Sequence, residues 1–336
     1  MRKFIQTLKE TGQKEMPHKF PGLDGAKGLL VLLVVLTHCL PQSMILYFMY
    51  FFHMPLFMAI SGFLVKVSTF ENGYSGYLKR MWTRLILPWM IAWVIFLPYR
   101  LNWGPISQLR ITDVIYPYYH LWYIPSYLIG SFLCYTIIRW NWKPWILLLG
   151  TAIISIIWYN VYRDNHIPVE NLPLYWLGDK RLFSYLFFFI IGFTIRNKMI
   201  HFKFNLTRVI LTLFAAFLLI VILVYKHESS WIIVWPYMFF NTSLVIFVLI
   251  FIAPNNWLQN KIFLLINKNS LGVYLYHPLL QTTIYTYIIH DKAQKNITNL
   301  TATIVFFAVM AGTLALVWIL KKWWFTDKYF LGNLKR

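Results

Sequence analysis

The 336-residue sequence contains little charge. Asp, Glu, Lys and Arg together make up 12% of the residues, whereas about 25% is typical of soluble domains. Hydrophobic residues reach 59%, and this composition excludes a soluble globular protein. Glycine and proline occur 15 times each and aromatic residues make up 20%, which excludes a collagen-like or disordered chain. The sequence therefore indicates a polytopic membrane protein.

Cysteine and acidic residues are also scarce. The two cysteines, Cys39 and Cys134, lie inside apolar runs and provide neither a disulfide framework nor metal-site spacing. We therefore expect no redox chemistry, no metal and no permanently bound cofactor. Only 11 acidic residues stand against 31 Lys and Arg, a formal net charge of +20. In a soluble protein this excess would suggest nucleic acid, but a lipid bilayer explains it better, so no nucleic-acid partner is expected.

Long apolar runs are what the sequence has in abundance. A helix needs roughly 20 mostly apolar residues to span a bilayer. The first run carries Asp24, Lys27 and His38 and is followed by no small-residue cleavage site, so it is expected to remain as a helix rather than be removed as a signal peptide. The sequence predicts an all-α membrane protein of about ten transmembrane helices, near 23–42, 44–66, 84–101, 120–138, 144–161, 182–196, 208–225, 231–253, 270–290 and 300–320.

The basic residues alternate from one side of these spans to the other. Of the 31 Lys and Arg, 23 fall before or at the start of the first span, in every second loop and in the tail. The positive-inside rule therefore predicts that both termini are cytoplasmic. We predict a basic cytoplasmic segment over 1–22, a single transmembrane domain over 23–322 and a basic cytoplasmic tail over 323–336.

Two outward segments, about 100–119 and 162–181, are rich in Tyr, Trp, Pro and Asn. Such segments cap a cavity or contact sugar rings. An aromatic belt at the membrane interface with ordinary loops explains them equally well.

Ionisable groups inside a span are costly and therefore mark functional candidates. Lys27 and His38 in the first run are 11 residues apart, which in an α-helix is three turns plus about 20°, so the two side chains share one face. The rise between them is about 16 Å. Lys27 is expected at the cytoplasmic rim and His38 in the outer half of the membrane.

Further histidines stand beside prolines and aromatic residues. His53, two residues before Pro55, is expected at a depth similar to that of His38. It either lines a polar pocket or packs as a hydrogen-bonded core residue. His120 opens a span beside Trp122 and is either an interfacial cap or a ligand-binding group. His277 directly precedes Pro278, and a helix interrupted inside the membrane favours a cavity-lining role.

Two arginines precede the third span on the cytoplasmic side. Arg80 and Arg84 are one helical turn apart, so their charges can converge on one anion. Topology alone also places basic residues there.

These residues in this order resemble the acyltransferase 3 family of integral-membrane acyltransferases, and most closely its branch of fucose 4-O-acetylase-like proteins. The resemblance rests on Leu23–Gly28 followed by His38, on Phe52–Phe57 with Ser61-Gly62, on His120–Tyr123 and on Ser270–Pro278, which together cover nearly the whole chain. Lys27 stands where the family commonly has Arg, and three residues separate Arg80 from Arg84 where the family often has two.

The resemblance implies transfer of an acyl group, most often acetyl, from cytoplasmic acyl-CoA to a hydroxyl of an envelope saccharide, which is either polymeric or lipid-linked. The protein would then lie in a bacterial plasma membrane. His38 would act as general base or carry the acyl group. The residues are assigned as follows: His38 and His53 to catalysis; Lys27, Arg80 and Arg84 to acyl-CoA binding; His120, Trp122, Tyr274 and His277 to the acceptor pocket.

Two other classes of membrane protein share some of these features. A saccharide transporter or flippase also has many spans and broken helices, but its usual marks are inverted repeats and midplane carboxylates. A purely structural membrane subunit leaves the pair of Lys27 and His38 unexplained. Some members of the family carry an extracytoplasmic esterase-like domain, so a partner protein or a homo-oligomer is a further expectation.

Overall fold

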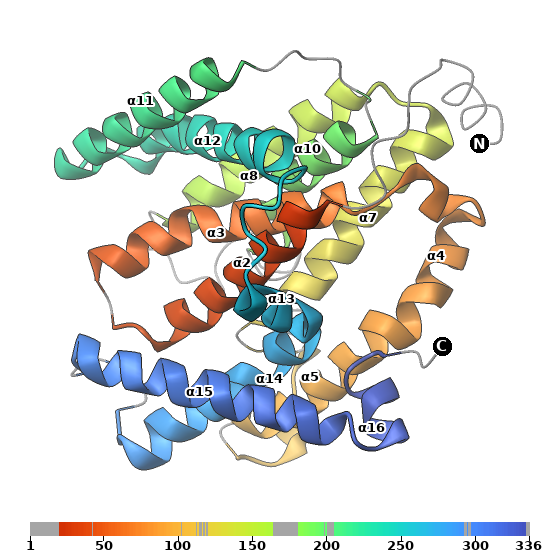
Figure 1. The fold of residues 1–336 in the computed structure, drawn as a ribbon, viewed down its shortest axis with the longest axis vertical. Coiled ribbons are helices and arrows are strands. Elements are labelled where there is room, and N and C mark those ends of the chain that lie inside the picture. Colours follow the sequence, from red (N-terminus) through yellow and green to blue (C-terminus); the bar gives the residue numbers. More distant parts are fainter. Residues whose placement is uncertain are drawn as a thin grey trace. The chain divides into compact units, whose positions relative to one another are not determined.

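The regular structure of this protein is helical throughout the part of the chain that the computed structural model describes, with no strand there (Figure 1). The described residues are 20–41, 43–101, 103–111, 113, 116, 118, 120–163, 181–197, 199, 205–291, 294 and 297–333. The predicted all-α class is confirmed. The predicted end segments 1–22 and 323–336 lie partly outside these residues.

Most of the helices are long, and three π-helical turns adjoin helices in the described part of the chain. The elements are α2 (Pro21–Cys39), α3 (Met44–Phe63), η1 (Val67–Phe70), α4 (Gly73–Met81), η2 (Trp82–Ile86), α5 (Leu87–Arg100), η3 (Ile106–Gln108), α7 (Tyr123–Trp140), α8 (Pro144–Arg163), α9 (Arg181–Ser184), α10 (Leu186–Arg196), α11 (Leu206–Tyr225), α12 (Ser230–Ile246), η6 (Phe247–Ile252), α13 (Lys261–Lys268), α14 (Ser270–Thr283), η7 (Ile284–Ile288), α15 (Asn299–Leu320) and α16 (Trp324–Tyr329). The π-helical elements are η2, η6 and η7.

Six helical segments among the described residues are long and apolar enough to cross a membrane. They are Pro21–Cys39, Ile45–Phe63, Gly73–Arg100, Leu206–Tyr225, Ser230–Ile252 and Asn299–Leu320. The other four predicted runs fall on α7, α8, α10 and α14, of which α10 has 11 residues and α14 has 14. A multi-pass membrane protein is therefore confirmed. The count of ten spans and the cytoplasmic placement of both ends stay predictions.

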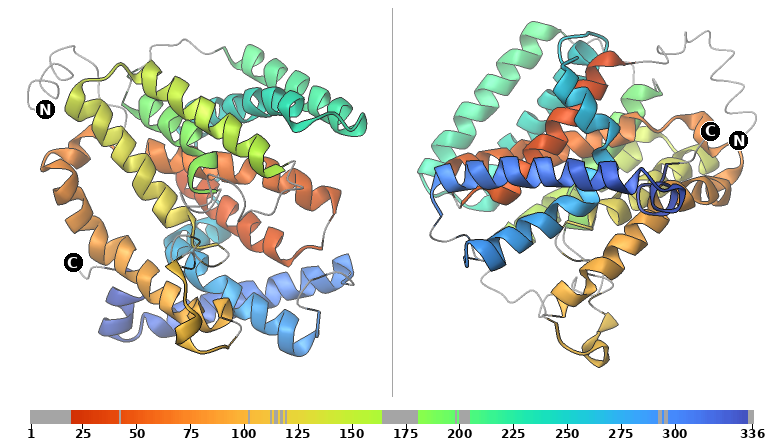
Figure 2. Two further views of the ribbon diagram at one scale, coloured as in Figure 1. Left: turned by 180° about the vertical axis from the view of Figure 1, so that it is seen from behind. Right: turned by 60° about the horizontal axis from the view of Figure 1, so that its bottom comes forward.

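The chain divides into two compact units. Within the described residues, unit 1 consists of 20–23, 54–77 and 125–257. Helices α11 and α12 form a hairpin in it and lie side by side in both views of Figure 2. Helix α10 crosses the second half of α3 at two glycines. A Cβ on Gly62 would lie 1.9 Å from the Phe189 carbonyl oxygen, and one on Gly192 would lie 1.9 Å from that of Ala59. The two backbones therefore touch, as is usual for membrane helices that pack through small residues.

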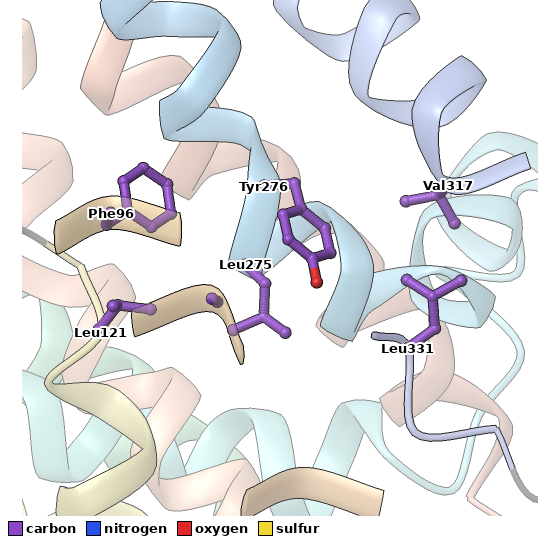
Figure 3. Close-up of a cluster of buried hydrophobic side chains, with 7 residues drawn as sticks. Phe96, Leu121, Leu275, Tyr276, Val317 and Leu331 are labelled. Carbon is purple, nitrogen blue, oxygen red and sulfur yellow. The ribbon is translucent and has the colours of Figure 1, made fainter. Parts of the chain in front are cut away.

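Unit 2 consists of 24–53, 78–124 and 258–333 within the same described residues. Its helices α14 and α15 pack together, and α14 also contacts α5. A buried hydrophobic cluster joins these helices, as Figure 3 shows. Its members are Ala92, Phe96, Leu121, Leu275, Tyr276, Val317 and Leu331. This cluster holds α14 in place next to the segment that leads into α7.

Glycine also determines how α2 packs in unit 2. A Cβ on Gly25 would lie 1.8 Å from the Leu258 carbonyl oxygen, and one on Gly28 would lie 1.9 Å from that of Phe263. Only glycine allows the helix backbone to come this close to the segment that enters α13. The spacing of three residues places both glycines on one face of α2. Lys27 lies between them in the sequence.

Candidate functional site in unit 2

All the site residues predicted from the sequence belong to unit 2. They are distributed over five places in the chain: Lys27 and His38 in α2, His53 in α3, Arg80 in α4 with Arg84 in η2, His120 and Trp122 before α7, and Tyr274 and His277 in α14.

The imidazole rings of His38 and His277 contact each other directly. His38 Nδ1 and His277 Nε2 are 2.8 Å apart, the ring centroids are 5.0 Å apart, and the two ring planes differ by 20°. The two residues are 239 positions apart in the sequence. His277 is fully buried, at 0% exposure. Its Nδ1 lies 2.7 Å from the carbonyl oxygen of Val273, one turn earlier in α14.

His120 completes a cluster of three imidazoles. Its ring centroid is 5.5 Å from that of His277, and its Nε2 donates to the Leu275 carbonyl oxygen at 3.2 Å. The Tyr274 hydroxyl donates to the backbone carbonyl of His120 at 2.8 Å. The structure therefore brings together four of the predicted residues, and we call His38, His120 and His277 the histidine cluster.

The end of α2, where His38 stands, is held by side chains from the ninth predicted run and the loop that follows it. Gln281 and Gln294 donate amide hydrogens to the backbone carbonyl of His38 at 2.9 and 3.1 Å. The Tyr285 hydroxyl donates to the carbonyl of Cys39 at 2.6 Å. Carbonyls at the end of a helix lack partners within the helix, so these bonds satisfy them. These residues were not predicted from the sequence, although a glutamine inside an apolar run is the same kind of signal as a histidine there.

Two predicted residues lie apart from the histidine cluster in their contacts. His53 is buried, its Nδ1 donates to the Met49 carbonyl at 2.5 Å and its ring lies 5.3 Å from that of Tyr50, so this hydrogen bond and this ring contact are both within α3. Trp122 is buried and its ring is in edge contact with that of Tyr123. The Tyr123 ring in turn lies 5.5 Å from that of Tyr274, so Trp122 borders the cluster through a neighbour.

The residues predicted to bind acyl-CoA lie on three elements. Lys27 is partly buried, and it stands one turn after Asp24, whose carboxylate accepts a hydrogen bond from Asn267 at 3.0 Å. Arg80 and Arg84 are both exposed. The π-helical turn η2 begins between them, so the angle between their side chains differs from that expected on a continuous α-helix.

The side chain of Lys321, at the end of α15, reaches the start of α14. The Lys321 ammonium donates to the side-chain oxygen of Asn269 at 2.6 Å. Burial, with the neighbouring positive charge of Lys268, lowers the pKa of Lys321 below its ordinary value. This places positive charge at the helix N-terminus, where the backbone N–H groups already favour anions.

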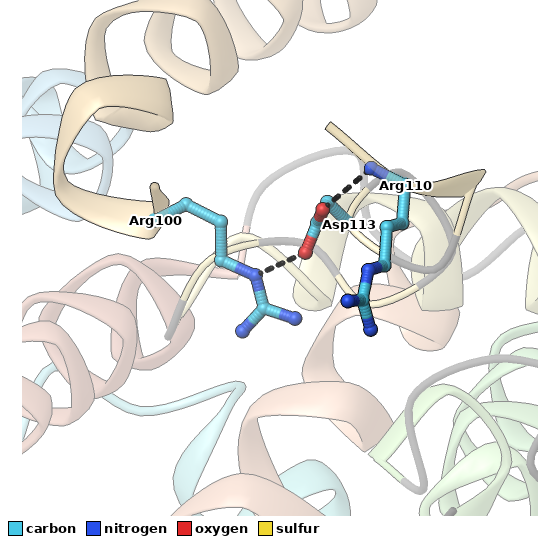
Figure 4. A network of polar contacts seen from close by, with 3 residues as sticks. All are labelled: Arg100, Arg110 and Asp113. Carbon is cyan, nitrogen blue, oxygen red and sulfur yellow. Dashed lines mark hydrogen bonds and ion pairs between the residues drawn. The ribbon is translucent and has the colours of Figure 1, made fainter. Parts of the chain in front are cut away.

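The outward segment 100–119 is described in part, and an ion pair ties its start to its middle (Figure 4). The Arg100 Nε donates to one carboxylate oxygen of Asp113 at 2.8 Å, while the backbone N–H of Arg110 donates to the other at 2.9 Å. The segment 162–181 lies almost entirely outside the described residues. Among the residues that are described, no three His, Cys, Asp or Glu side chains are grouped so as to hold a metal ion.

Comparison with known proteins agrees with the resemblance. The acyltransferase 3 family, described as an acyltransferase domain, matches residues 20–322. The chain is also similar to the nodulation protein NolL of Mesorhizobium japonicum, with 29% identity over 136 residues, which covers 34% of each chain. The chain thus matches about a third of that relative's length. No solved structure matches the chain. The family matches residues 20–322, and six helical segments in the described part of the chain are long and apolar enough to cross a membrane. This chain therefore belongs to the acyltransferase 3 family and is a multi-pass membrane acyltransferase.

Proposed function

We propose that this protein transfers an acyl group, most often acetyl, from cytoplasmic acyl-CoA to a hydroxyl of an envelope saccharide in a bacterial plasma membrane. The observation that carries the proposal is the hydrogen bond between His38 and His277 in a buried part of unit 2. An imidazole oriented by a second group is the arrangement that general-base and nucleophilic catalysis of acyl transfer require.

The chemistry assigned to His38 follows from the atoms that must move. The His38 imidazole takes the proton of the acceptor hydroxyl while the hydroxyl oxygen bonds to the thioester carbon. The carbon–sulfur bond then breaks, and the CoA thiolate leaves and takes up the proton from the imidazolium. In the alternative sequence, the imidazole first accepts the acyl group and then passes it to the hydroxyl.

The positive charge of the chain supports the donor half of the proposal. Lys27 is about 16 Å from His38 along α2, as estimated from the helical rise, and the intervening face is that of a single helix. CoA carries phosphates, so its head would be held by Lys27, Arg80 and Arg84 at the cytoplasmic rim. The thioester arm would extend along α2 towards His38.

The test uses purified full-length protein in sealed liposomes of known orientation. We expect acyl-CoA to be consumed only when it is supplied at the face that bears the termini, with acylated saccharide appearing at the opposite face and without any ion gradient. Lipid-linked and polymeric saccharides are supplied as separate acceptors. The His38→Ala variant should lose acylation while retaining membrane abundance and acyl-CoA binding. A Thr313→Val variant, which removes a buried hydroxyl in α15, is the control for effects of substitution, purification and reconstitution.

The outcomes separate the enzyme from a carrier. Movement of saccharide across the membrane with intact acyl-CoA would refute the proposal and favour a flippase. A response to a proton or sodium gradient would indicate a coupled transporter, since about 2.3 kcal/mol per charge is available from 100 mV. Near-normal acylation by His38→Ala would remove His38 from catalysis.

A further inference from the structure

The hydrogen bond between His277 and the backbone determines which ring nitrogens of His277 and His38 carry a proton. Its Nδ1 lies 2.7 Å from the Val273 carbonyl oxygen. A carbonyl oxygen only accepts, so Nδ1 of His277 carries the hydrogen. In the neutral ring the other nitrogen, Nε2, then holds a lone pair. This lone pair faces His38 Nδ1 at 2.8 Å, so His38 must donate from Nδ1.

The same reasoning determines which nitrogen of His38 is basic. A neutral imidazole with its hydrogen on Nδ1 has its lone pair on Nε2. If His277 were instead protonated on both nitrogens, His38 would accept at Nδ1 and its Nε2 would carry the hydrogen. That alternative buries a positive charge on a residue with 0% exposure, which is costly. Burial of His277 therefore favours the state in which His38 Nε2 is the base.

The backbone of α14 fixes the orientation of the imidazole rings that hydrogen-bond to it. Val273 and Leu275 present their carbonyl oxygens to the rings of His277 and His120. The helix is itself held by the Tyr276 hydroxyl, which donates to the Phe330 carbonyl at 3.1 Å, and by the buried cluster around Leu275. A ring bonded to a packed helix backbone has little freedom to rotate, so His277 is fixed before any substrate binds.

We propose that His277 is a positioning residue rather than a ligand for the acceptor: it fixes His38 in the tautomer with the hydrogen on Nδ1 and directs its Nε2 lone pair to the acceptor hydroxyl. This inference rests on the proposed function of His38. When His38 takes up the hydroxyl proton, the bond from its Nδ1 to His277 becomes charge-assisted and stronger. No proton needs to pass to His277, which acts as the third group that orients a catalytic base.

The kinetic test compares two substitutions at position 277 in the full-length protein. Leucine removes the acceptor, whereas the side-chain oxygen of glutamine reaches the place of Nε2 and still accepts a hydrogen bond. We expect His277→Leu to lower kcat by about 100-fold or more, with both KM values within about twofold of wild type. His277→Gln should retain kcat within about tenfold. Thr313→Val, which removes a buried hydroxyl from the neighbouring helix α15, is the control and should retain full activity.

A spectroscopic measurement makes the assignment independent of activity. In the full-length protein with 15N-labelled histidine, the signals of His38 are identified by their loss in His38→Ala. We expect a protonated Nδ1 and an unprotonated Nε2 in the wild type, and a changed tautomer ratio in His277→Leu. A wild-type His38 protonated on Nε2 would overturn the inference, as would unchanged kcat in His277→Leu or glutamine and leucine variants that are equally inactive. If wild-type protein consumed no acyl-CoA, the proposed function would fail, while the tautomer of His38 would still decide the role of His277.

Discussion

At the residue scale, Lys27 is the residue predicted to bind acyl-CoA that lies on the same helix as His38. Both side chains project from α2, so one rigid element determines the distance between them. Lys27 is a compact point charge, and it lacks the planar fork with which arginine binds a phosphate through two parallel bonds. Its side chain is partly buried.

Substitutions at position 27 test the charge. We expect Lys27→Arg to keep substantial activity, because the charge is preserved, and Lys27→Gln to raise the KM for the acyl-CoA donor with little change in kcat. A contact made equally in the ground and transition states affects KM rather than kcat. Steady-state kinetics with varied acyl-CoA provide the measurement. An unchanged donor KM in Lys27→Gln would contradict the assignment of Lys27 to donor binding.

At the element scale, α2 is placed by backbone contact. Its glycine face lies against the chain before and within α13, where a Cβ on Gly28 would be 1.9 Å from a carbonyl oxygen. Backbone atoms cannot give way as a flexible side chain can, so any larger residue must displace the whole helix. Because α2 carries both Lys27 and His38, its displacement changes the site as well as the fold.

Gly28→Ala is therefore expected to destabilise the protein by about 1–3 kcal/mol, the usual cost of overpacking. Gly150→Ala in α8 is the matched control, because no atom lies within 4 Å of the added Cβ. Alanine there should be neutral or stabilising by about 0.5–1 kcal/mol, since glycine inside a helix is unfavourable. Thermal unfolding of the purified proteins in detergent measures both effects. Equal midpoints for the two variants would show that α2 does not depend on this close contact.

At the scale of the whole molecule, the distribution of charge predicts sidedness. In the ten-span arrangement, the turn at Lys143 between α7 and α8 faces the cytoplasm, and the turn at Ser229 between α11 and α12 faces outward. Both residues are exposed in the structure. The two native cysteines are at 0% exposure, so they provide little background for thiol labelling.

Cysteine labelling tests this arrangement. We expect a membrane-impermeant maleimide to label Ser229→Cys in intact cells, and to label Lys143→Cys only after the membrane is opened. The positive-inside rule places the basic loop in the cytoplasm, where the reagent cannot reach it. Labelling of both positions from outside, or of Lys143→Cys alone, would require a different number or orientation of spans.

Part of the fold and of the site was predictable from the sequence. The apolar runs indicated a helical membrane protein, and the cost of ionisable groups in lipid singled out His38, His120 and His277. The same argument selected His53, whose Nδ1 hydrogen bond goes to the Met49 carbonyl of its own helix. It did not select Gln281, which holds the His38 carbonyl. The free-energy cost of placing a polar group in lipid indicates that the group needs a partner, but it does not identify that partner.

The sequence by itself thus determined the class of protein and the helical state of the apolar runs, and it provided the expected sidedness. Hydropathy and charge suffice for this because they act locally along the chain. The pairing of His38 with His277 was decided by tertiary structure alone, since 239 residues separate them. In a membrane helix the lipid-facing and protein-facing sides are both apolar, so periodicity does not show which face meets which neighbour. Close packing at Gly25 and Gly28, and the cluster around α14, determine which rings meet.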